Sequence, residues 1–278
     1  MKKNMMKLMT LREQQLLQLS ILKKVHELCE LNNIHYFLMY GTLLGAVRHH
    51  GFIPWDDDID IAMMREDFDK FNEICEHGGL PENMVIQNQN TDPYFEFLLA
   101  RICMKGTYSD DYARKELMSF HYACIDVFPL DNIPTSIEIQ MKHRKKIYHL
   151  MKFIYYRTNY KRKQISAIKS LIKNIVSSTL KIVPLSKYLA LLDKEIKRYD
   201  NIPTEKCADL LSTLNIGYEN ISFDKSDFGS GVLLAFEDDK FYAPVNYEKL
   251  LTQMYGDYMK LPPESERVAR HMAYLMEE

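Results

Sequence analysis

Cysteine is scarce in this sequence, and the few cysteines are not arranged in pairs. The chain has 278 residues and 5 cysteines, and no two of them are spaced as CxxC. Scattered cysteines in odd number exclude a disulfide framework and a thiolate zinc site, because both need paired or regularly spaced thiols. We therefore expect reduced thiols, as in a cytoplasmic protein. The five positions are Cys29, Cys75, Cys103, Cys124 and Cys207.

Long apolar runs and a strong net charge are also missing. The polar stretch 10–15 follows the N-terminal lysines Lys2, Lys3 and Lys7 and interrupts any hydrophobic run, so we expect no secretory signal. No uncharged apolar stretch is long enough to span a bilayer. The formal net charge of -2 gives no global field that would attract nucleic acid. These absences predict a cytoplasmic protein without a nucleic-acid partner.

Helical and strand-like segments are mixed without a regular alternation. This pattern predicts an α+β fold, with a mixed β-sheet flanked by helices. Thr10 and Glu13 form a capping box that starts the first helix. We divide the chain into a core with an N-terminal helix (1–134), a basic helical insertion (135–200) and a C-terminal part that completes the core (201–278). Helices are expected at 11–32, 43–49, 65–76 and 247–255, and strands at 34–40, in the later part of 56–62, and at 84–87, 97–104 and 122–128.

The segment 139–192 contains no Asp or Glu, whereas Lys and Arg recur in it, as in 144–146 and 161–163. Such a charge run is usually a solvated helical face. It could instead attract an anionic lipid-linked glycan or the inner surface of a membrane, and we hold this as a hypothesis of peripheral membrane contact. Binding to nucleic acid is a third interpretation, but no recognised motif supports it.

The sharpest chemical signal is a cluster of carboxylates. Residues two apart in a strand share a face, so Asp58 and Asp60 are expected to lie side by side while Ile59 and Ile61 pack behind them. Two carboxylates this close repel each other unless a cation lies between them, and Mg²⁺ suits hard oxygen ligands. Asp126 lies in the apolar run 123–128, where a shared metal would compensate its charge.

These acids also have simpler interpretations. Asp126 could form a structural ion pair with Arg101, and the Asp run could be a polar turn. Gly41 and Thr42, at an expected strand-to-helix junction, provide a second signal. Glycine allows a phosphate to approach the backbone, and a helix N-terminus offers free N–H groups. The combination of this turn with a following Asp-x-Asp strand is typical of nucleotidyltransferases.

The sequence resembles the LicD family of phosphocholine transferases. The resemblance lies in residues 36–60, which read YFLMYGTLLGAVRHHGFIPWDDDID, and continues in MMREDFDKF (63–71), CIDVFPLD (124–131) and YGDYMKLPPESER (255–267). It covers most of the chain, from about residue 35 to 270. Fukutin-related proteins, which transfer ribitol phosphate, share the same core, but their cysteine-rich zinc element is missing here.

The resemblance implies a nucleotidyltransferase-like fold, dependence on Mg²⁺ (with Mn²⁺ as an alternative) and a CDP-linked donor. Asp58, Asp60 and Asp126 match the acids of the motif as metal-binding and catalytic residues, and Gly41 and Thr42 match its donor-phosphate turn. The implied reaction is attack by a hydroxyl of a lipid-linked cell-surface glycan precursor on the phosphate that carries the small group, with release of CMP.

Other roles are open at this point. Arg48 and Arg101 are candidates for binding the donor phosphates, because the guanidinium fork suits phosphate oxygens. Trp55 could contact a choline head group, although packing beneath the metal loop is favoured. The general base is unassigned between Asp126 and Asp57. Two rival functions are transfer of a nucleoside monophosphate and non-catalytic binding of a nucleotide or glycan.

Overall fold

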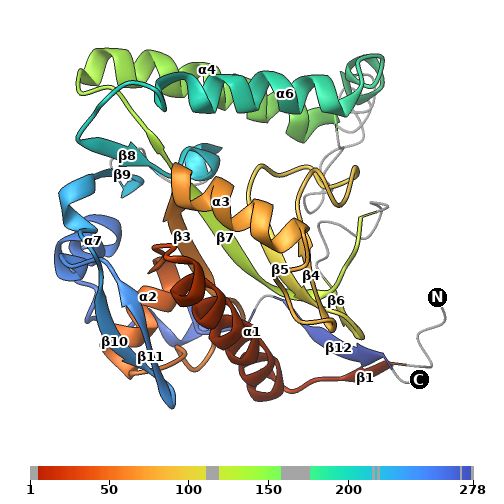
Figure 1. Cartoon of the computed structure of the whole chain (residues 1–278), viewed down its shortest axis with the longest axis vertical. Coiled ribbons are helices and arrows are strands. Elements are labelled where there is room, and N and C mark those ends of the chain that lie inside the picture. The colour runs from red at the N-terminus through yellow and green to blue at the C-terminus, as the bar shows by residue number, and fades with distance from the viewer. Residues whose placement is uncertain are drawn as a thin grey trace.

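A mixed β-sheet forms the centre of the molecule (Figure 1). The computed structural model describes residues 6–110, 119–157, 176–214, 217, 220–269 and 271–276. Strands β3 and β7 are parallel, and the other neighbours in the sheet are antiparallel. The order is β2 (Phe37–Leu38), β3 (Asp60–Met64), β7 (Ala123–Asn132), β5 (Ala100–Met104) and β4 (Met84–Gln87), and β8 (Lys206–Ala208) links the far end of β7 to β9 (Ser222–Asp224).

Two helices cover one face of this sheet, α1 (Leu11–Asn32) and α3 (Arg65–Glu76) (Figure 1). Successive strand residues point to opposite faces, so Ile61 and Val127 point toward the helices and join the main hydrophobic core. Phe68 and Phe71 of α3 are buried in the same core. On the opposite face of β3 and β7, Ala62 and Leu130 pack in a further buried cluster with Phe223 and Phe228, and the polar side chains lie toward the Asp60–Asp126 end of these strands.

A pair of helices lies beyond one end of the sheet, at the top of Figure 1. Helices α4 (Ile137–Arg157) and α6 (Leu185–Ile196) bury Ile147, Leu189 and Leu192 against the 3₁₀ turn η3 (Leu210–Leu214) in a second hydrophobic cluster. The helices confirm the expected helical character of this segment. The basic triplet 161–163 lies outside the described residues, and the division into three parts stays a prediction.

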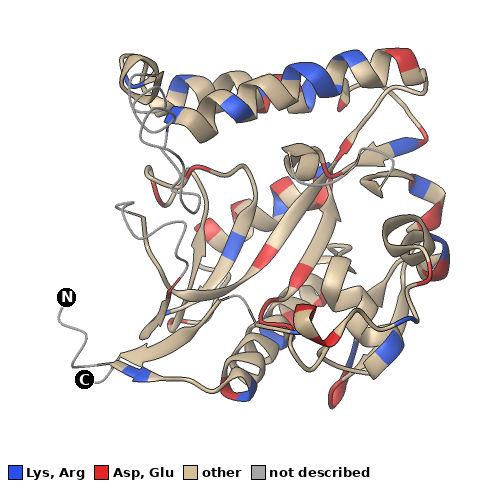
Figure 2. Ribbon diagram, turned by 180° about the vertical axis from the view of Figure 1, so that it is seen from behind, with Lys and Arg blue, Asp and Glu red and all other residues tan. Residues whose placement is uncertain are grey.

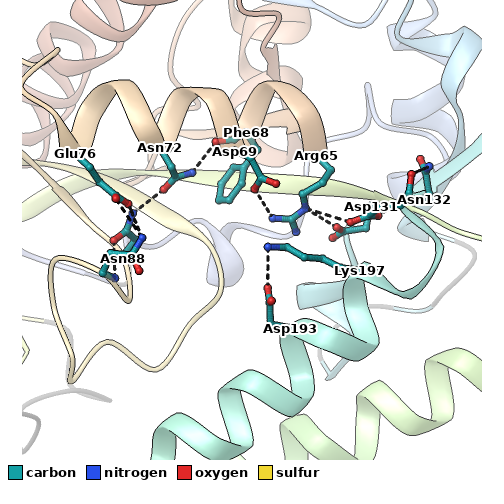
Figure 3. A network of polar contacts seen from close by, with 12 residues as sticks. Arg65, Phe68, Asp69, Asn72, Glu76, Asn88, Asp131, Asn132, Asp193 and Lys197 are labelled. Carbon is teal, nitrogen blue, oxygen red and sulfur yellow. Dashed lines mark hydrogen bonds and ion pairs between the residues drawn. The ribbon is translucent and has the colours of Figure 1, made fainter. Parts of the chain in front are cut away.

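A buried ion pair joins the sheet to this helical end (Figure 3). Arg65, the first residue of α3, donates through Nε to Oδ1 of Asp131 at 2.7 Å, near the end of β7. Arg65 also contacts Asp69 at 3.3 Å, and its Nε lies 3.9 Å from Asp200. Lys197 pairs with Asp193 of α6 at 3.2 Å beside them. The contact of Arg65 with Asp200, which follows α6, connects the α3–β7 ion pair to the helical end.

The C-terminal residues return to the core. A hairpin, β10 (Val232–Phe236) and β11 (Asp239–Ala243), precedes α7 (Tyr247–Tyr255). A small sheet then pairs β12 (Ala273–Met276) with β1 (Met6–Leu8) and β6 (Thr107–Ser109), so the first and last of the described strands lie side by side (Figure 1). The remaining 3₁₀ turns are η2 (Lys197–Tyr199), η5 (Lys225–Asp227) and η6 (Glu264–Glu266). Among the described residues, no helix combines the length and apolarity that crossing a membrane requires.

Several predicted elements are confirmed. The hydroxyl of Thr10 accepts from the backbone N–H of Glu13 at 3.2 Å, and the Glu13 carboxylate accepts from the Thr10 N–H at 2.7 Å, which completes the capping box. The helices predicted at 11–32, 65–76 and 247–255 and the strand at 84–87 have the predicted bounds.

Other predicted boundaries were wrong. The strand expected over 34–40 is reduced to β2, because its pairing with β3 covers Phe37 and Leu38. Tyr40 has a left-handed backbone (φ 49°), which ends the strand, and helix α2 (Tyr40–His49) begins there instead of at Leu43. Gly41 and Thr42 thus belong to the first helical turn. Strand β3 begins at Asp60, so Asp58 lies in the extended segment before it. Strand β5 begins at Ala100, after a loop, and not at Phe97.

Candidate active site

A row of polar residues crosses the face of the sheet that lies away from α1 and α3, which we call the open face. Asp60 of β3 is in register with Asp126 of β7, Asp126 is opposite Arg101 of β5, and Arg101 is opposite Gln87 of β4. Residues in register on neighbouring strands project from the same face. The fold therefore brings Asp60 and Asp126 together, as predicted.

Three carboxylates from one segment gather at the Asp60 end of this row. Burial raises the pKa of Asp58, and the charges of Asp57 and Asp126 raise it further. The pKa of Asp60 is raised well above its usual value by burial and then by the charges of Asp58 and Asp126. Burial and the nearby Asp58 and Asp57 raise the pKa of Asp56 to about 8. The cluster holds more negative charge than its protein surroundings balance, which is the condition that a divalent cation relieves.

Arg101 and Asp126 form an ion pair. The Arg101 Nε lies 2.7 Å from Oδ1 of Asp126, and both side chains are largely buried. Burial alone would lower the pKa of Arg101, but the Asp126 carboxylate raises it overall. The guanidinium also lies over the rings of Phe95 and Phe97, at 5.6 and 6.0 Å from their centroids. The structural partnership considered from the sequence is thus present, and phosphate binding by Arg101 stays a prediction.

The first turn of α2 lies against the acid cluster. A Cβ atom added to Gly41 would come within 2.6 Å of Oδ2 of Asp56, so the glycine makes room for that carboxylate. Thr42 is buried, and its hydroxyl accepts from the N–H of Asp60 at 2.8 Å. The Thr42 side chain therefore fixes the start of β3. The backbone N–H groups of this first helical turn lack partners within the helix and can receive an anion.

Arg48 and residues of the C-terminal segment close one side of the cluster. Arg48 donates to the backbone carbonyl of Tyr258 at 2.9 Å. Burial raises the pKa of Tyr255, and the charges of Asp60, Asp56 and Asp58 add to this shift. Tyr255 is therefore close to the acids, and Arg48 lies near enough to oppose the shift. A phosphate-binding role for Arg48 stays a prediction.

Asp57 has a different environment from the other acids in its run. Its side chain is 5% exposed, and its Oδ2 accepts from the backbone N–H of His271. The imidazole Nδ1 of His271 lies 3.5 Å from its other oxygen. Among the described residues, Asp57, Asp58 and His271 offer three ligand atoms within 4.8 Å of one another. Asp57 thus connects the acid segment to the residues just before the C-terminal strand. Metal binding by Asp58, Asp60 and Asp126 stays a prediction.

Sequence reasoning missed several residues of this site. Asp56 belongs to the same acidic run, and Tyr255 belongs to the quoted C-terminal motif, so both carried a signal. Asp209, which follows β8, had no signal in the sequence. Its charge nevertheless contributes to the raised pKa of Asp60, and its Oδ2 accepts from the hydroxyl of Tyr40 at 2.5 Å. His271 also carried no signal, because its contact with Asp57 depends on where the C-terminal strand pairs.

Comparisons with known proteins identify relatives of this chain. The family model described as "LicD/FKTN/FKRP, nucleotidyltransferase domain" matches residues 33–164. The lipopolysaccharide cholinephosphotransferase LicD of Haemophilus influenzae is 32% identical over 284 residues, which cover 98% of this chain and 100% of that protein. An uncharacterized protein of Rickettsia typhi is 56% identical over 54 residues, 19% of this chain and 18% of its own length. Human ribitol 5-phosphate transferase FKRP is 47% identical over 38 residues, 14% of this chain and 8% of its own.

Proposed function

This chain belongs to the LicD family, and on that basis we propose that it transfers phosphocholine from CDP-choline to a hydroxyl group of a cell-surface glycan precursor. The observation that carries the proposal is the near full-length similarity to a lipopolysaccharide cholinephosphotransferase. The acid cluster on the open face of the sheet supports it, because transfer at phosphorus depends mainly on positioning and neutralisation of charge.

We propose Mg²⁺ as the cofactor, with Asp58, Asp60 and Asp126 as its ligands. The donor set consists of carboxylate oxygens, which Mg²⁺ prefers. Burial and then the neighbouring carboxylates raise the pKa of Asp58 and of Asp60, and a bound cation would offset both effects. Such an ion would supply neutralisation of the donor diphosphate. Mn²⁺ has similar ligand preferences and is an alternative.

The residues around the cluster would hold the donor in place. The backbone N–H groups at the start of α2 would bind donor phosphate oxygens, because the first N–H groups of a helix have no partner within it. Arg48, beside Tyr255, would bind phosphate from the C-terminal side. The acceptor hydroxyl would attack the phosphorus that carries choline, the bond to the CMP oxygen would break, and the hydroxyl proton would pass to a base. Asp57 is poorly suited as that base because both of its oxygens face His271.

Product analysis tests this function. Purified protein is incubated with Mg²⁺ and with CDP-choline, CDP-ribitol or CDP-ethanolamine, with and without candidate glycans, and CMP release is measured. We expect CMP from CDP-choline that increases with an accepting glycan. We also expect Asp58→Asn and Asp60→Asn to reduce the rate by about 10²-fold or more while the fold is kept. Transfer of the CMP moiety to the acceptor would contradict the proposal.

We further propose that the outer surface of α4 contacts an anionic membrane, where a lipid-linked acceptor would be found. Ile137 and Met141 are 68% and 47% exposed, and Tyr148 follows them on the same side of the helix. Lys145 and Lys152 accompany this stripe, and the Lys152 Nζ lies 5.1 Å from the ring centre of Tyr148. Figure 2 shows Lys and Arg recurring along this helical end. Exposed apolar side chains flanked by cations are typical of surfaces that lie on anionic lipid.

Vesicle sedimentation tests the membrane contact. We expect binding to vesicles that contain phosphatidylglycerol, little binding to pure phosphatidylcholine, and weaker binding as salt rises. Ile137→Ser with Met141→Ser should reduce the bound fraction. Leu31→Ser, at an 86% exposed position at the far end of α1, serves as the matched control. Equal vesicle binding by the two variants, or binding that does not depend on lipid charge, would contradict membrane contact through this surface of α4.

A further inference from the structure

A small cavity lies beside the acid cluster and shares two of its carboxylates. Its volume is about 90 Å³, and Asp58 and Asp126 form part of its wall. A cavity of this size has room for several water molecules, which suits a small head group and not a nucleoside. Whatever occupies the cavity would lie next to a phosphate held at the acids.

Aromatic side chains form another part of the wall. Phe120 and Tyr122 both line the cavity, and their ring centres are 5.9 Å apart with the planes tilted by 34°. The Phe120 side chain remains 36% exposed, so its ring is accessible to a ligand. Aromatic faces attract quaternary ammonium groups through their quadrupole, without needing a hydrogen bond that such a group cannot donate.

The backbone that carries these rings is held in place by a buried network. The Oδ2 atom of Asp92 accepts from the hydroxyl of Ser119 at 2.5 Å and from the N–H of Phe120 at 3.1 Å. Gln87 donates to the same Asp92 oxygen at 2.8 Å and to the carbonyl of Phe120 at 3.0 Å. Gln87 is the last residue of the polar row that starts at Asp60. The backbone at Phe120 is therefore held in place relative to the polar row before any ligand binds.

The charges around the cavity favour a cation. Its wall contains Asp57, Asp58 and Asp126 against Arg101 and His271. Arg101 is neutralised by its ion pair with Asp126 at 2.7 Å, and His271 lies beside Asp57 at 3.5 Å. The wall thus holds more carboxylates than guanidinium groups, and His121 is a further ionisable side chain in it. Because Mg²⁺ on Asp58 and Asp126 would offset part of this negative charge, the aromatic faces would supply most of the attraction for a quaternary ammonium.

Trp55, the aromatic candidate from the sequence, is already engaged elsewhere. The Arg267 guanidinium lies over its ring at 5.4 Å from the centroid, and the His49 ring approaches it edge-on at 6.3 Å. Trp55 also packs against the main core, which agrees with the packing role favoured from the sequence. The face that a choline group would need is therefore covered by Arg267.

We infer that this cavity binds the quaternary ammonium head group of the donor, with Phe120 and Tyr122 as specificity-determining residues. The inference rests on the proposed function, because it takes the donor phosphate to lie at the acids. In phosphocholine, two carbon atoms separate the nitrogen from the ester oxygen of the phosphate. The head group must therefore bind within a few ångströms of the phosphate site, and this cavity adjoins it.

Binding measurements with and without the head group test the inference. Calorimetric titration in Mg²⁺ gives the Kd of CDP-choline, CDP-ethanolamine and CMP for each variant. We expect Phe120→Leu with Tyr122→Leu to weaken CDP-choline binding by about tenfold and leave CMP binding unchanged. Phe120→Tyr keeps an aromatic face and should bind CDP-choline like the natural protein. Phe153→Leu, an exposed phenylalanine on α4, is the matched control.

Two outcomes separate this inference from the proposed function. If the natural protein turns over CDP-choline but the double leucine variant keeps the same ratio of Kd values for CDP-choline and CMP, the head group binds elsewhere and the inference is overturned. If the natural protein neither binds nor turns over CDP-choline while it releases CMP from another donor, the proposed donor itself is wrong.

Discussion

Asp60 and Asp126 lie directly opposite each other on the parallel strands β3 and β7, so two carboxylates share one small region of the sheet. Each raises the cost of ionising the cluster, as the elevated pKa of Asp60 indicates. A cation between them would convert this repulsion into binding energy. The first two predictions follow from this pair and its neighbours.

Replacing Asp60 with Asn should stabilise the metal-free protein and abolish its response to Mg²⁺. The substitution replaces a carboxyl group that is costly to ionise beside its neighbours, which at pH 8 should raise Tm by about 2–4 °C, or about 1 kcal/mol in a chain of this size. The natural protein should gain stability on addition of Mg²⁺, and the variant should not. Differential scanning calorimetry with EDTA or Mg²⁺ measures both effects. Equal Mg²⁺ shifts in the two proteins would contradict the assignment.

The metal-free protein should lose stability as the pH rises toward 8. The pKa of Asp56 is about 8 in the folded chain, against an ordinary value of 3.8. The folded state therefore binds this proton more tightly than the unfolded state does. The resulting contribution to the free energy of unfolding is fully present below pH 3.8 and is lost as pH rises through about 8. Urea unfolding at pH 6, 7, 8 and 9 in EDTA checks the slope. Mg²⁺ and Asp56→Asn should each flatten it, and a rise in stability over this range would refute the prediction.

Arg101 can be tested for its two roles separately. Arg101→Met leaves the largely buried Asp126 without its partner and should destabilise the fold by about 3 kcal/mol. Arg101→Lys keeps the charge but loses the guanidinium fork, so a phosphate-binding Arg101 would show weaker CDP-choline binding in this variant with a smaller loss of stability. Urea unfolding and calorimetric titration distinguish the cases. Unchanged affinity in Arg101→Lys would mean that the residue serves only as the partner of Asp126.

Gly41→Ala should impair the site through a steric clash. The new methyl group would lie 2.6 Å from the Asp56 carboxylate, which must then move within a crowded acid cluster. We expect a loss of about 1–3 kcal/mol in stability, together with weaker Mg²⁺ binding. Combining it with Asp56→Gly removes the clashing side chain and should restore most of the stability. If the double variant is no more stable than Gly41→Ala, the clash lies elsewhere.

The Arg65–Asp131 pair should matter for stability and not for chemistry. Asp131 is fully buried, so Arg65→Met would leave its charge uncompensated and cost about 3–5 kcal/mol in the free energy of unfolding. Arg65→Met with Asp131→Leu replaces the pair by apolar groups and should recover most of this loss. CMP release per folded molecule should be unchanged in both. A large drop in rate for the stable double variant would assign the pair a role in turnover.

Much of the local structure could be predicted from the sequence. Helices α1, α3 and α7 follow from a 3.6-residue apolar period and from stop signals such as Asn33 and Gly78, which act over a few residues. The acids of the site were recognised because a metal site needs carboxylates close together in the chain. These signals are local, and they do not depend on what packs against them.

Strand boundaries and partners were decided by the tertiary structure. Residues 34–36 continue the strand-like run, yet the pairing with β3 is limited to Phe37 and Leu38, which face Ala62 and Ile61. The contact of Arg101 with Asp126 follows from the register of β5 on β7, and that of His271 with Asp57 from the position of the last strand. Such pairings join residues far apart in the sequence.

The sequence by itself determined the helices, the mixed fold class and the acidic residues on which the proposed chemistry depends. The tertiary structure alone decided which side chains surround those acids, including Tyr255, Asp209 and the aromatic wall at Phe120 and Tyr122. The physical reason is that helix formation is governed by neighbours three and four residues away, whereas the environment of a buried charge is set by whichever strands and loops pack around it.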